Sequence, residues 1–220
     1  MKPNRFTQLL ITLAASACCA SPALAEREAG WDFGGDLIYQ GSKDVTFKGG
    51  SSASIDDDLG LALSFVYRFN ARFELLFGLD WNNVDYNFNI RPDTGGLSFQ
   101  GHGTLESWAP RVGVNINVLK GDFTPYVTGG VGWAWIDTNI PDSPPYQSCW
   151  WDPWYGYWCG TFQSTRSVDQ MTYNFGAGLR WDFSPEIVLR LGYEKHWIEL
   201  DEANSAPGFD QIKFTVAAKY

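Results

Sequence analysis

The chain closes on Ile212-Lys213-Phe214-Thr215-Val216-Ala217-Ala218-Lys219-Tyr220, in which two kinds of side chain alternate. Every second residue counted back from the end is apolar, namely Tyr220, Ala218, Val216, Phe214 and Ile212. Such alternation predicts a β-strand with one apolar face. Because this strand ends on an aromatic residue with no tail beyond it, its free edge needs a partner. The first strand of the chain is the obvious partner, and that pairing would close a barrel.

The N-terminal segment indicates export from the cytoplasm. Lys2 and Arg5 precede an apolar run that extends to Ala20, and Ala23-Leu24-Ala25 forms a small-x-small cleavage site. We therefore predict a secretory signal peptide over 1–25 and a mature domain over 26–220. The alternative is a lipoprotein cysteine at Cys18, although the residues before it lack the expected leucine.

Composition restricts the class of protein further. The chain has a formal net charge of −9 at pH 7, so nucleic acid is not an expected partner. The mature sequence contains no apolar run near the length of about 18 residues that a spanning helix requires. A membrane protein of this sequence would have to be built from strands. The 11 Trp, 10 Tyr and 15 Phe residues could supply its aromatic girdles.

Alternating segments of about ten residues, separated by turn chemistry, recur along the mature chain. We predict strands over 31–39, 59–69, 73–81, 108–118, 125–136, 173–183, 187–197 and 212–220, with the third continuing through Tyr86 and Phe88. Tight turns at Asn70-Ala71, Lys120-Gly121-Asp122 and Ser184-Pro185-Glu186 alternate with long connections. The prediction is an all-β fold, an eight-stranded antiparallel up-and-down transmembrane β-barrel with short periplasmic turns.

Short motifs carry a resemblance to a known family. They are Pro125-Tyr126-Val127-Thr128-Gly129-Gly130-Val131-Gly132, Leu191-Gly192-Tyr193 and the terminal aromatic residue. The chain resembles the small outer-membrane β-barrels, which include OmpA-like, OmpX-like, OmpW-like and opacity-type proteins. The resemblance implies localisation in the outer membrane, contact with outer-membrane lipid, and a C-terminal signal (Phe214, Val216, Tyr220) that the barrel-assembly machinery reads. It leaves the function open, because this architecture serves anchors, adhesins, small channels and a few lipid-modifying enzymes.

Strand parity places an equal set of acids and bases on the inward face of the barrel. They are Asp32, Asp36, Glu74, Asp80, Asp182 and Glu194 with Arg68, Arg111, Arg180, Arg190, Lys213 and Lys219. Eight strands leave an interior that side chains can fill. Charges confined there need partners, so we predict a lumen closed by salt bridges. The alternative is a narrow, gated polar conduit.

Cys149 and Cys159 are the cysteines that remain after removal of the signal peptide. In an oxidising envelope they predict one disulfide within the long connection between the fifth and sixth strands. Aromatic residues fill the enclosed segment, namely Trp150, Trp151, Trp154, Tyr155, Tyr157 and Trp158. They predict a small aromatic cluster in the loop, aromatic side chains that rest on the outer lipid interface, or a rigid recognition surface for a glycan or protein ligand.

The sequence offers few candidate residues for a catalytic or metal-binding site. His102, Thr104 and Glu106 share an outward face, which resembles the His-x-Ser pair and carboxylate of lipid A deacylases, but Thr replaces Ser. Asp56-Asp57-Asp58 could help to bind a divalent cation, although a solvated loop end explains it as well. We expect no cofactor and no enzymatic activity. The sequence predicts an outer-membrane barrel whose surface loops serve envelope integrity, recognition or adhesion, with a small-solute or hydrophobic-ligand channel as the alternative and a lipid-modifying enzyme as the less favoured one.

Overall fold

The computed structural model describes residues 27–47, 50–91, 98–141, 146–154, 156–162, 165–200, 203 and 205–220. The predicted signal peptide and its cleavage site lie outside these residues. Every regular element in the described ranges is a β-strand. Among them there is no helix of the length and hydropathy that a membrane-spanning helix needs.

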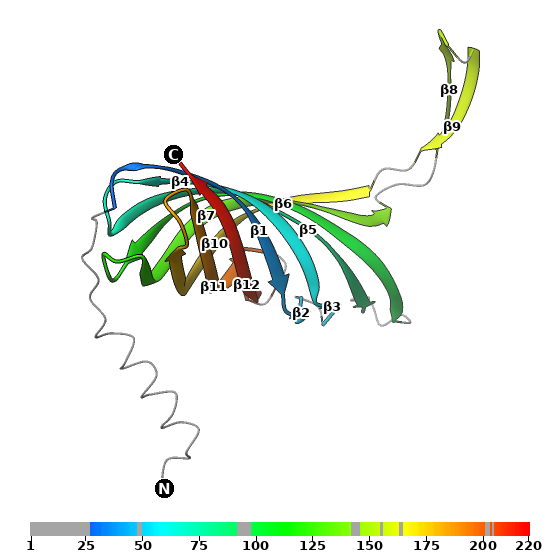
Figure 1. The fold of residues 1–220 in the computed structure, drawn as a ribbon. Coiled ribbons are helices and arrows are strands. Elements are labelled where there is room, and N and C mark those ends of the chain that lie inside the picture. Colours follow the sequence, from blue (N-terminus) through cyan, green and yellow to red (C-terminus); the bar gives the residue numbers. More distant parts are fainter. Residues whose placement is uncertain are drawn as a thin grey trace, which may run out of the picture.

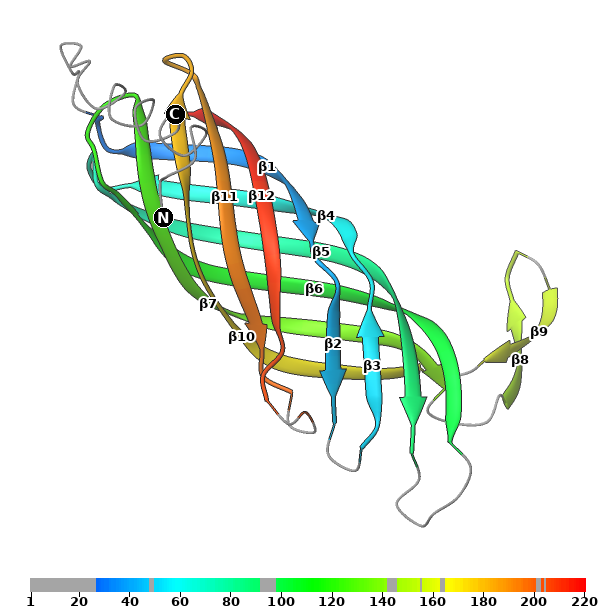
Figure 2. The same cartoon turned by 90° about the horizontal axis from the view of Figure 1, so that it is seen from below.

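The strands form one closed antiparallel barrel with two small additions (Figures 1 and 2). The barrel strands, in spatial order, are β1 (Gly30–Gln40), β4 (Asp58–Arg68), β5 (Phe73–Ile90), β6 (Phe99–Asn117), β7 (Phe123–Pro141), β10 (Thr165–Asp182), β11 (Ile187–Ile198) and β12 (Gly208–Lys219). β2 (Lys43–Thr46) and β3 (Ser52–Ile55) extend the β1–β4 hairpin, and β3 pairs with β5. β8 (Tyr146–Asp152) and β9 (Gly156–Phe162) form a separate two-stranded sheet. The predicted eight-stranded antiparallel barrel is confirmed.

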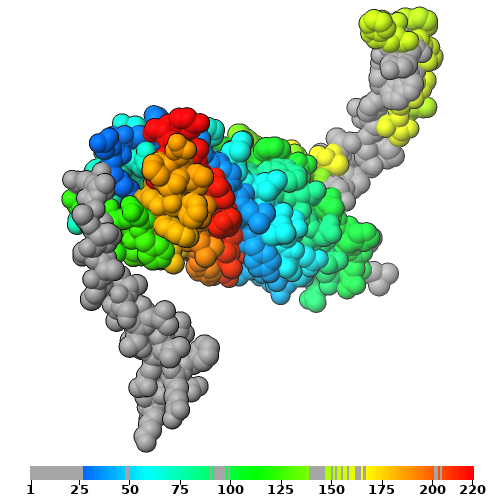
Figure 3. Space-filling view, viewed as in Figure 1, coloured from blue at the N-terminus to red at the C-terminus, as the bar shows by residue number. Residues whose placement is uncertain are grey.

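The first and last strands close the barrel, as the terminal sequence predicts. β12 lies against β1 with Phe214 opposite Leu37. At the end of the ladder the Trp31 amide donates to the Tyr220 carbonyl at 2.9 Å, and the Tyr220 amide donates to the Trp31 carbonyl at 2.7 Å. The space-filling view shows red β12 lying directly beside blue β1 (Figure 3). The edge that the last strand would otherwise expose is therefore paired.

Side chains fix the tight turns, and in the turn after β6 Thr124 Oγ1 accepts a hydrogen bond from the Leu119 amide at 2.9 Å. Asn70 Oδ1 accepts hydrogen bonds from the amides of Arg72 and Phe73 at 2.8 and 3.0 Å. Ser184 Oγ accepts from the amides of Glu186 and Ile187 at 3.2 and 3.0 Å. Asn and Ser favour turns by satisfying backbone donors in this way. We call this side of the barrel the turn end and the opposite side the loop end.

Several strands continue farther toward the loop end than the sequence indicates. β6 begins at Phe99, β7 reaches Pro141 and β10 begins at Thr165, whereas β5, which ends at Ile90, continues through Tyr86 and Phe88 as predicted. β2 and β3 occupy part of what the sequence presents as a polar connection, and β8–β9 lies in the predicted connection of about thirty residues. The barrel wall is thus longer than a membrane-spanning strand of about ten residues needs.

The polarity of the wall reverses along its length, and this explains the extra length. In the turn-end half the apolar side chains point outward, for example Leu61, Leu63, Val112, Val114 and Leu191. In the loop-end half they point inward and form a buried core of Val45, Ile55, Val84, Tyr86, Ala203 and Phe209. The turn-end half therefore fits a wall with lipid on its outer face and a polar interior. The loop-end half fits a wall with water on its outer face and an apolar interior.

Candidate functional site

The charged side chains that strand parity assigns to the lumen all project into it. Asp182 and Lys219 are partly buried at the turn end, and the other ten are buried. Several of their ion pairs join strands that are not neighbours in the wall, for example Arg180 on β10 with Glu74 on β5, so these contacts cross the lumen. We call these residues the lumen network.

The middle of the lumen network is a cluster of two carboxylates, Asp32 and Glu74, and three guanidinium groups. Arg180 lies 2.5 Å from Glu74 and 3.1 Å from Asp32, and Arg190 lies 2.5 Å from Asp32. Arg68 adds a contact of 3.3 Å to Asp32. The Arg180 side chain is 0% exposed. Charges this far from water are stable only when each has an opposite partner.

A second cluster, of two cations and two carboxylates, lies closer to the loop end. Arg111 lies 3.1 Å from Asp80 and 3.3 Å from Glu194, while Lys213 lies 2.8 and 3.5 Å from the same two carboxylates. Asn174 donates a further hydrogen bond to Glu194 at 2.8 Å. A Cβ at Gly78, on the neighbouring strand, would lie 2.7 Å from Arg111 Nε, so glycine makes room for this guanidinium group.

Two residues differ from the simple pairing that equal numbers of acids and bases imply. Asp36 accepts a hydrogen bond from Ser64 at 3.1 Å. Arg27, to which the sequence analysis gives no role, lies 2.5 Å from Asp182 and also donates to the carbonyls of Ala71 and Gly121. Asp182 further contacts Arg180 at 2.9 Å and Lys219 at 3.3 Å. Arg27 precedes the first strand, so strand parity could not have identified it.

Above the lumen network, the loop-end half encloses a cavity of about 570 Å³. We call this cavity the outer cup. Its wall consists mainly of Val45, Phe47, Ala53, Ile55, Val84, Tyr86, Phe88, Leu105, Ile136, Val168, Ile198, Leu200 and Phe209. Pockets of this size with predominantly apolar walls are typical small-molecule sites.

The floor of the outer cup is polar but uncharged. Gln40, Asn82, Ser107 and Gln170 contribute to the lining. Asn82 is the next inward residue after Asp80 on β5, and Gln40 accepts a hydrogen bond at 3.0 Å from Gln211, the inward neighbour of Lys213 on β12. The outer cup therefore rests directly on the loop-end cluster of the lumen network.

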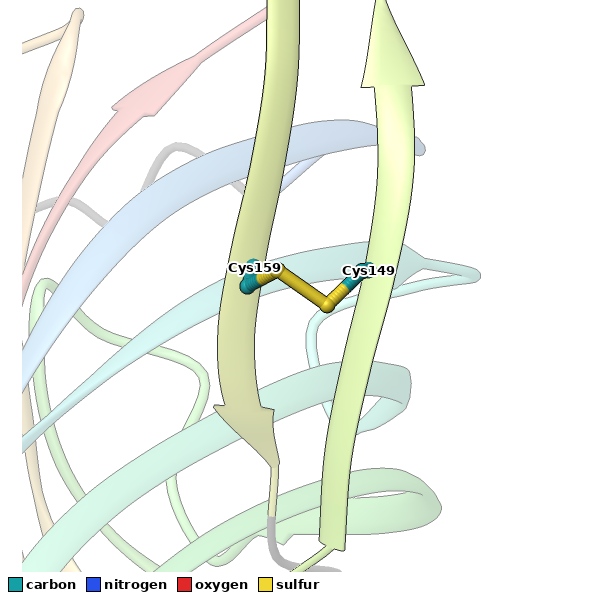
Figure 4. The surroundings of a disulfide bond; sticks show 2 residues. All are labelled: Cys149 and Cys159. Carbon is teal, nitrogen blue, oxygen red and sulfur yellow. A yellow bond between two sulfur atoms is a disulfide. The ribbon is translucent and has the colours of Figure 1, made fainter.

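The β8–β9 hairpin stands apart from the barrel wall, beyond the ends of β7 and β10 (Figures 1 and 2). Cys149 and Cys159 are register partners, and their disulfide links the two strands as predicted (Figure 4). Gly156 adopts a φ of +77° next to the turn, a conformation that glycine tolerates best.

The hairpin presents aromatic side chains to solvent. Trp151, Trp154 and Tyr157 are 72%, 89% and 69% exposed, and Trp151 and Tyr157 are opposite each other. Tyr155 and the side chains of Trp150 and Trp158 lie outside the described part of the structure.

The candidate catalytic residues are exposed along one strand and do not converge. His102, Thr104 and Glu106 follow one another on the outer face of β6. A strand rises about 3.3 Å per residue, so His102 and Glu106 are about 13 Å apart along it. The Glu106 carboxylate instead accepts hydrogen bonds from the indoles of Trp81 and Trp108 at 2.9 and 3.1 Å. Across the described ranges, no three His, Cys, Asp or Glu side chains are grouped to hold a metal ion.

The outer cup was not predicted from the sequence. Its signal is present in the sequence, because the inward positions of β5 change from polar at Asp80 and Asn82 to apolar at Val84, Tyr86 and Phe88.

Phe214, Val216 and Tyr220 lie on the outer surface of the barrel and are 44%, 47% and 78% exposed. Their reading by the assembly machinery stays a prediction.

Comparison with known proteins agrees with this architecture. The family model described as "Outer membrane protein beta-barrel domain" matches residues 10–220. No curated protein matches the chain. Among solved structures, Neisserial surface protein A is 12% identical with a TM-score of 0.50, covering 88% of this chain and 98% of its own.

Two further solved structures have lower TM-scores. The attachment invasion locus protein Ail of Yersinia pestis, solved with the heparin analogue sucrose octasulfate, is 14% identical with a TM-score of 0.48, covering 88% of this chain and 100% of its own. OprG from Pseudomonas aeruginosa is 13% identical with a TM-score of 0.47, covering 89% and 96%. Since the family model spans nearly the whole sequence, the chain belongs to the outer membrane protein β-barrel domain family and is a protein of the bacterial outer membrane.

Proposed function

We propose that this protein is a non-enzymatic outer-membrane barrel that captures a small, predominantly apolar molecule at the cell surface and holds it in the outer cup. The observation that carries the proposal is the reversal of wall polarity, which creates an apolar cavity of about 570 Å³ in the half that projects beyond the lipid band. Short turns face the periplasm in this architecture, so the loop end faces outside.

The hydrophobic effect supplies the affinity for such a ligand. Each CH₂ group moved from water to an apolar wall contributes about 0.8 kcal/mol. A ten-carbon chain therefore gains roughly 8 kcal/mol before the loss of its translational and conformational freedom is subtracted. Apolar side chains from β2, β3, β5, β6, β7 and β10 to β12 surround the space, so most of the ligand surface would be buried.

The lumen network favours capture over conduction. Arg180 to Glu74 and Arg111 to Glu194 are contacts between strands that do not pair with each other, so they cross the interior below the outer cup. A permeant molecule would have to separate buried ion pairs, which leaves charges without partners. Ion pairs across the lumen therefore weigh against the alternative of a continuous polar channel.

Methyl NMR of the protein in lipid nanodiscs tests the proposal. Ile55, Ile136 and Ile198 line the outer cup, whereas Ile116, Ile187 and Ile212 face outward and are 41%, 39% and 47% exposed. Addition of 1-decanol should shift the δ1 methyl signals of the first set with a saturable dependence on concentration. The outward set reports ligand that merely dissolves in the bilayer. Shifts confined to the outward set would contradict the proposal.

A second candidate function is surface recognition by the β8–β9 hairpin. It is favoured by the exposure of Trp151, Trp154 and Tyr157 on a hairpin closed by the Cys149–Cys159 disulfide. Large aromatic side chains provide contact area at low entropic cost, and a disulfide holds them in position before binding. A glycan or a protein at the cell surface fits such a surface.

Replacing Trp151, Trp154 and Trp158 together with Ala tests this second candidate. Assembly and heat-resistant migration of the barrel should be unchanged, because the hairpin is a sheet separate from the barrel. Whole-cell adhesion and glycan-array binding should be lost. A Cys149→Ser variant should weaken the same binding. If both variants bind like the wild type, the hairpin has no role in recognition.

A further inference from the structure

The charge distribution around the outer cup indicates which class of apolar molecule it accepts. Among the described residues that line the cavity, none is Asp, Glu, Lys, Arg or His. The polar part of the lining consists of amides and hydroxyls, which donate and accept hydrogen bonds without carrying charge. A bound head group would therefore meet hydrogen-bonding partners but no counterion.

The cations nearest to the floor already have partners. Arg111 and Lys213 each contact both Asp80 and Glu194 at 2.8 to 3.5 Å. An anionic head group on the floor would have to compete with these carboxylates. It would also approach them closely, and like charges in a confined interior repel strongly.

The outer surface of the same strands adds a repulsive field. The loop-end positions that face away from the cup carry exposed carboxylates at Asp44, Asp85, Glu106, Asp137, Asp169 and Glu199. The whole chain has a formal net charge of −9 at pH 7. Surface charges of one sign around a low-dielectric opening lower the local concentration of ligands with the same sign.

We infer that the outer cup selects uncharged amphiphiles, with an apolar body of about ten carbons and a hydroxyl or amide head on the polar floor, and excludes carboxylates of the same length. This inference rests on the proposed function and names its ligand class. The head group lies near Gln40, Asn82 and Gln170, and the chain lies between the apolar walls toward the opening.

Matched ligands test the selectivity. Binding of 1-decanol and of decanoate is measured at pH 9, where decanoate is ionised, from the methyl shifts of Ile55, Ile136 and Ile198 at measured free ligand concentrations. We expect decanoate to bind about 100-fold or more weakly, because a buried carboxylate without a counterion is strongly disfavoured. Equal affinities would overturn the inference but leave the proposed function intact. Binding of neither ligand would count against the proposed function itself.

A positive charge introduced into the lining should reduce the preference for the uncharged ligand. Gln170 lines the outer cup, and Asp169 is the exposed neighbour on the opposite face of β10. Gln170→Lys should increase decanoate affinity by about 10-fold or more, because it supplies a counterion inside a low-dielectric cavity. Asp169→Lys changes the net charge by two units, one more than Gln170→Lys does. It should nevertheless increase decanoate affinity by less than about 3-fold, since solvent screens that position. If the two variants respond alike, the head group does not lie on the floor.

Discussion

Replacing Arg180 with Ala should destabilise the barrel by about 3 to 5 kcal/mol, the range measured when one partner of a buried ion pair is removed. The Arg180 side chain is 0% exposed and contacts Glu74, Asp32 and Asp182 at 2.5, 3.1 and 2.9 Å. Its loss leaves these carboxylates with fewer cations in a confined interior. The expected readout is a lower temperature for the loss of heat-resistant migration in a gel.

The matched control is Lys195→Ala. Lys195 pairs with Asp210 at 3.3 Å, but these side chains are 40% and 54% exposed. Exposed pairs contribute about 1 kcal/mol or less, so this variant should migrate like the wild type. If Arg180→Ala fails to assemble, Arg180→Met combined with Glu74→Gln removes one charge of each sign and should recover part of the loss. Wild-type heat resistance in Arg180→Ala would contradict a lumen held closed by buried ion pairs.

Filling the outer cup should abolish ligand capture. Ala53 lines the cavity on β3, opposite Val45 on β2 and Phe88 on β5. An Ala53→Trp side chain would occupy part of the space that the ligand needs. We expect 1-decanol affinity to fall by about 100-fold or more, which corresponds to roughly 2.7 kcal/mol of binding free energy. The methyl shifts of Ile136 and Ile198 provide the measurement.

The neighbouring residue provides the control for this substitution. Ser54 is exposed on the opposite face of β3, where it donates a hydrogen bond to Asp44 at 2.7 Å. Ser54→Trp adds the same side chain without entering the cavity, so its 1-decanol affinity should match that of the wild type. A similar loss in both variants would point to disruption of the β2–β3 extension and would remove the support for a ligand inside the cup.

The sequence predicted the barrel well because membrane-spanning strands carry a strong physical constraint. Each must present apolar side chains to lipid at every second position, as Leu61, Leu63 and Phe65 do on β4. Tight turns marked by Asn70 and Ser184 then separate the strands into pairs. The same parity places Arg111 and Arg180 in the lumen, although it does not specify which carboxylates they contact.

The loop-end half was harder to predict because its constraint is the opposite one. Val84 and Tyr86 are inward and apolar, whereas Asn83 and Asp85 are outward and polar. The continuation of the third strand through Tyr86 and Phe88 was predicted, but its inward apolar face there was not, and the loop-end parts of β6, β7 and β10 were taken for connections. The β2–β3 extension shows the same effect, since its two strands are only four residues long and each carries few apolar residues, such as Val45 and Ile55.

The alternation of side chains along strands also gives no information on contacts made by residues outside the strands. Arg27 reaches Asp182 from the segment before β1, and no periodicity marks that approach. The disulfide was predictable because two cysteines in an oxidising compartment have one possible pairing. The hairpin that contains it was not, because its short strands, rich in aromatic residues, alternate without a clear polar face.

The most direct test of the central claim is anomalous diffraction from crystals grown with 10-bromo-1-decanol. The bromine atom locates one end of the ligand without reliance on weak density for the chain. The proposed function predicts a bromine peak inside the loop-end half, among Val45, Phe47 and Phe88 near the opening, with the hydroxyl end toward Gln40 and Gln170. Peaks confined to the lipid-facing band around Leu63 and Val114, with none in the outer cup, would contradict it.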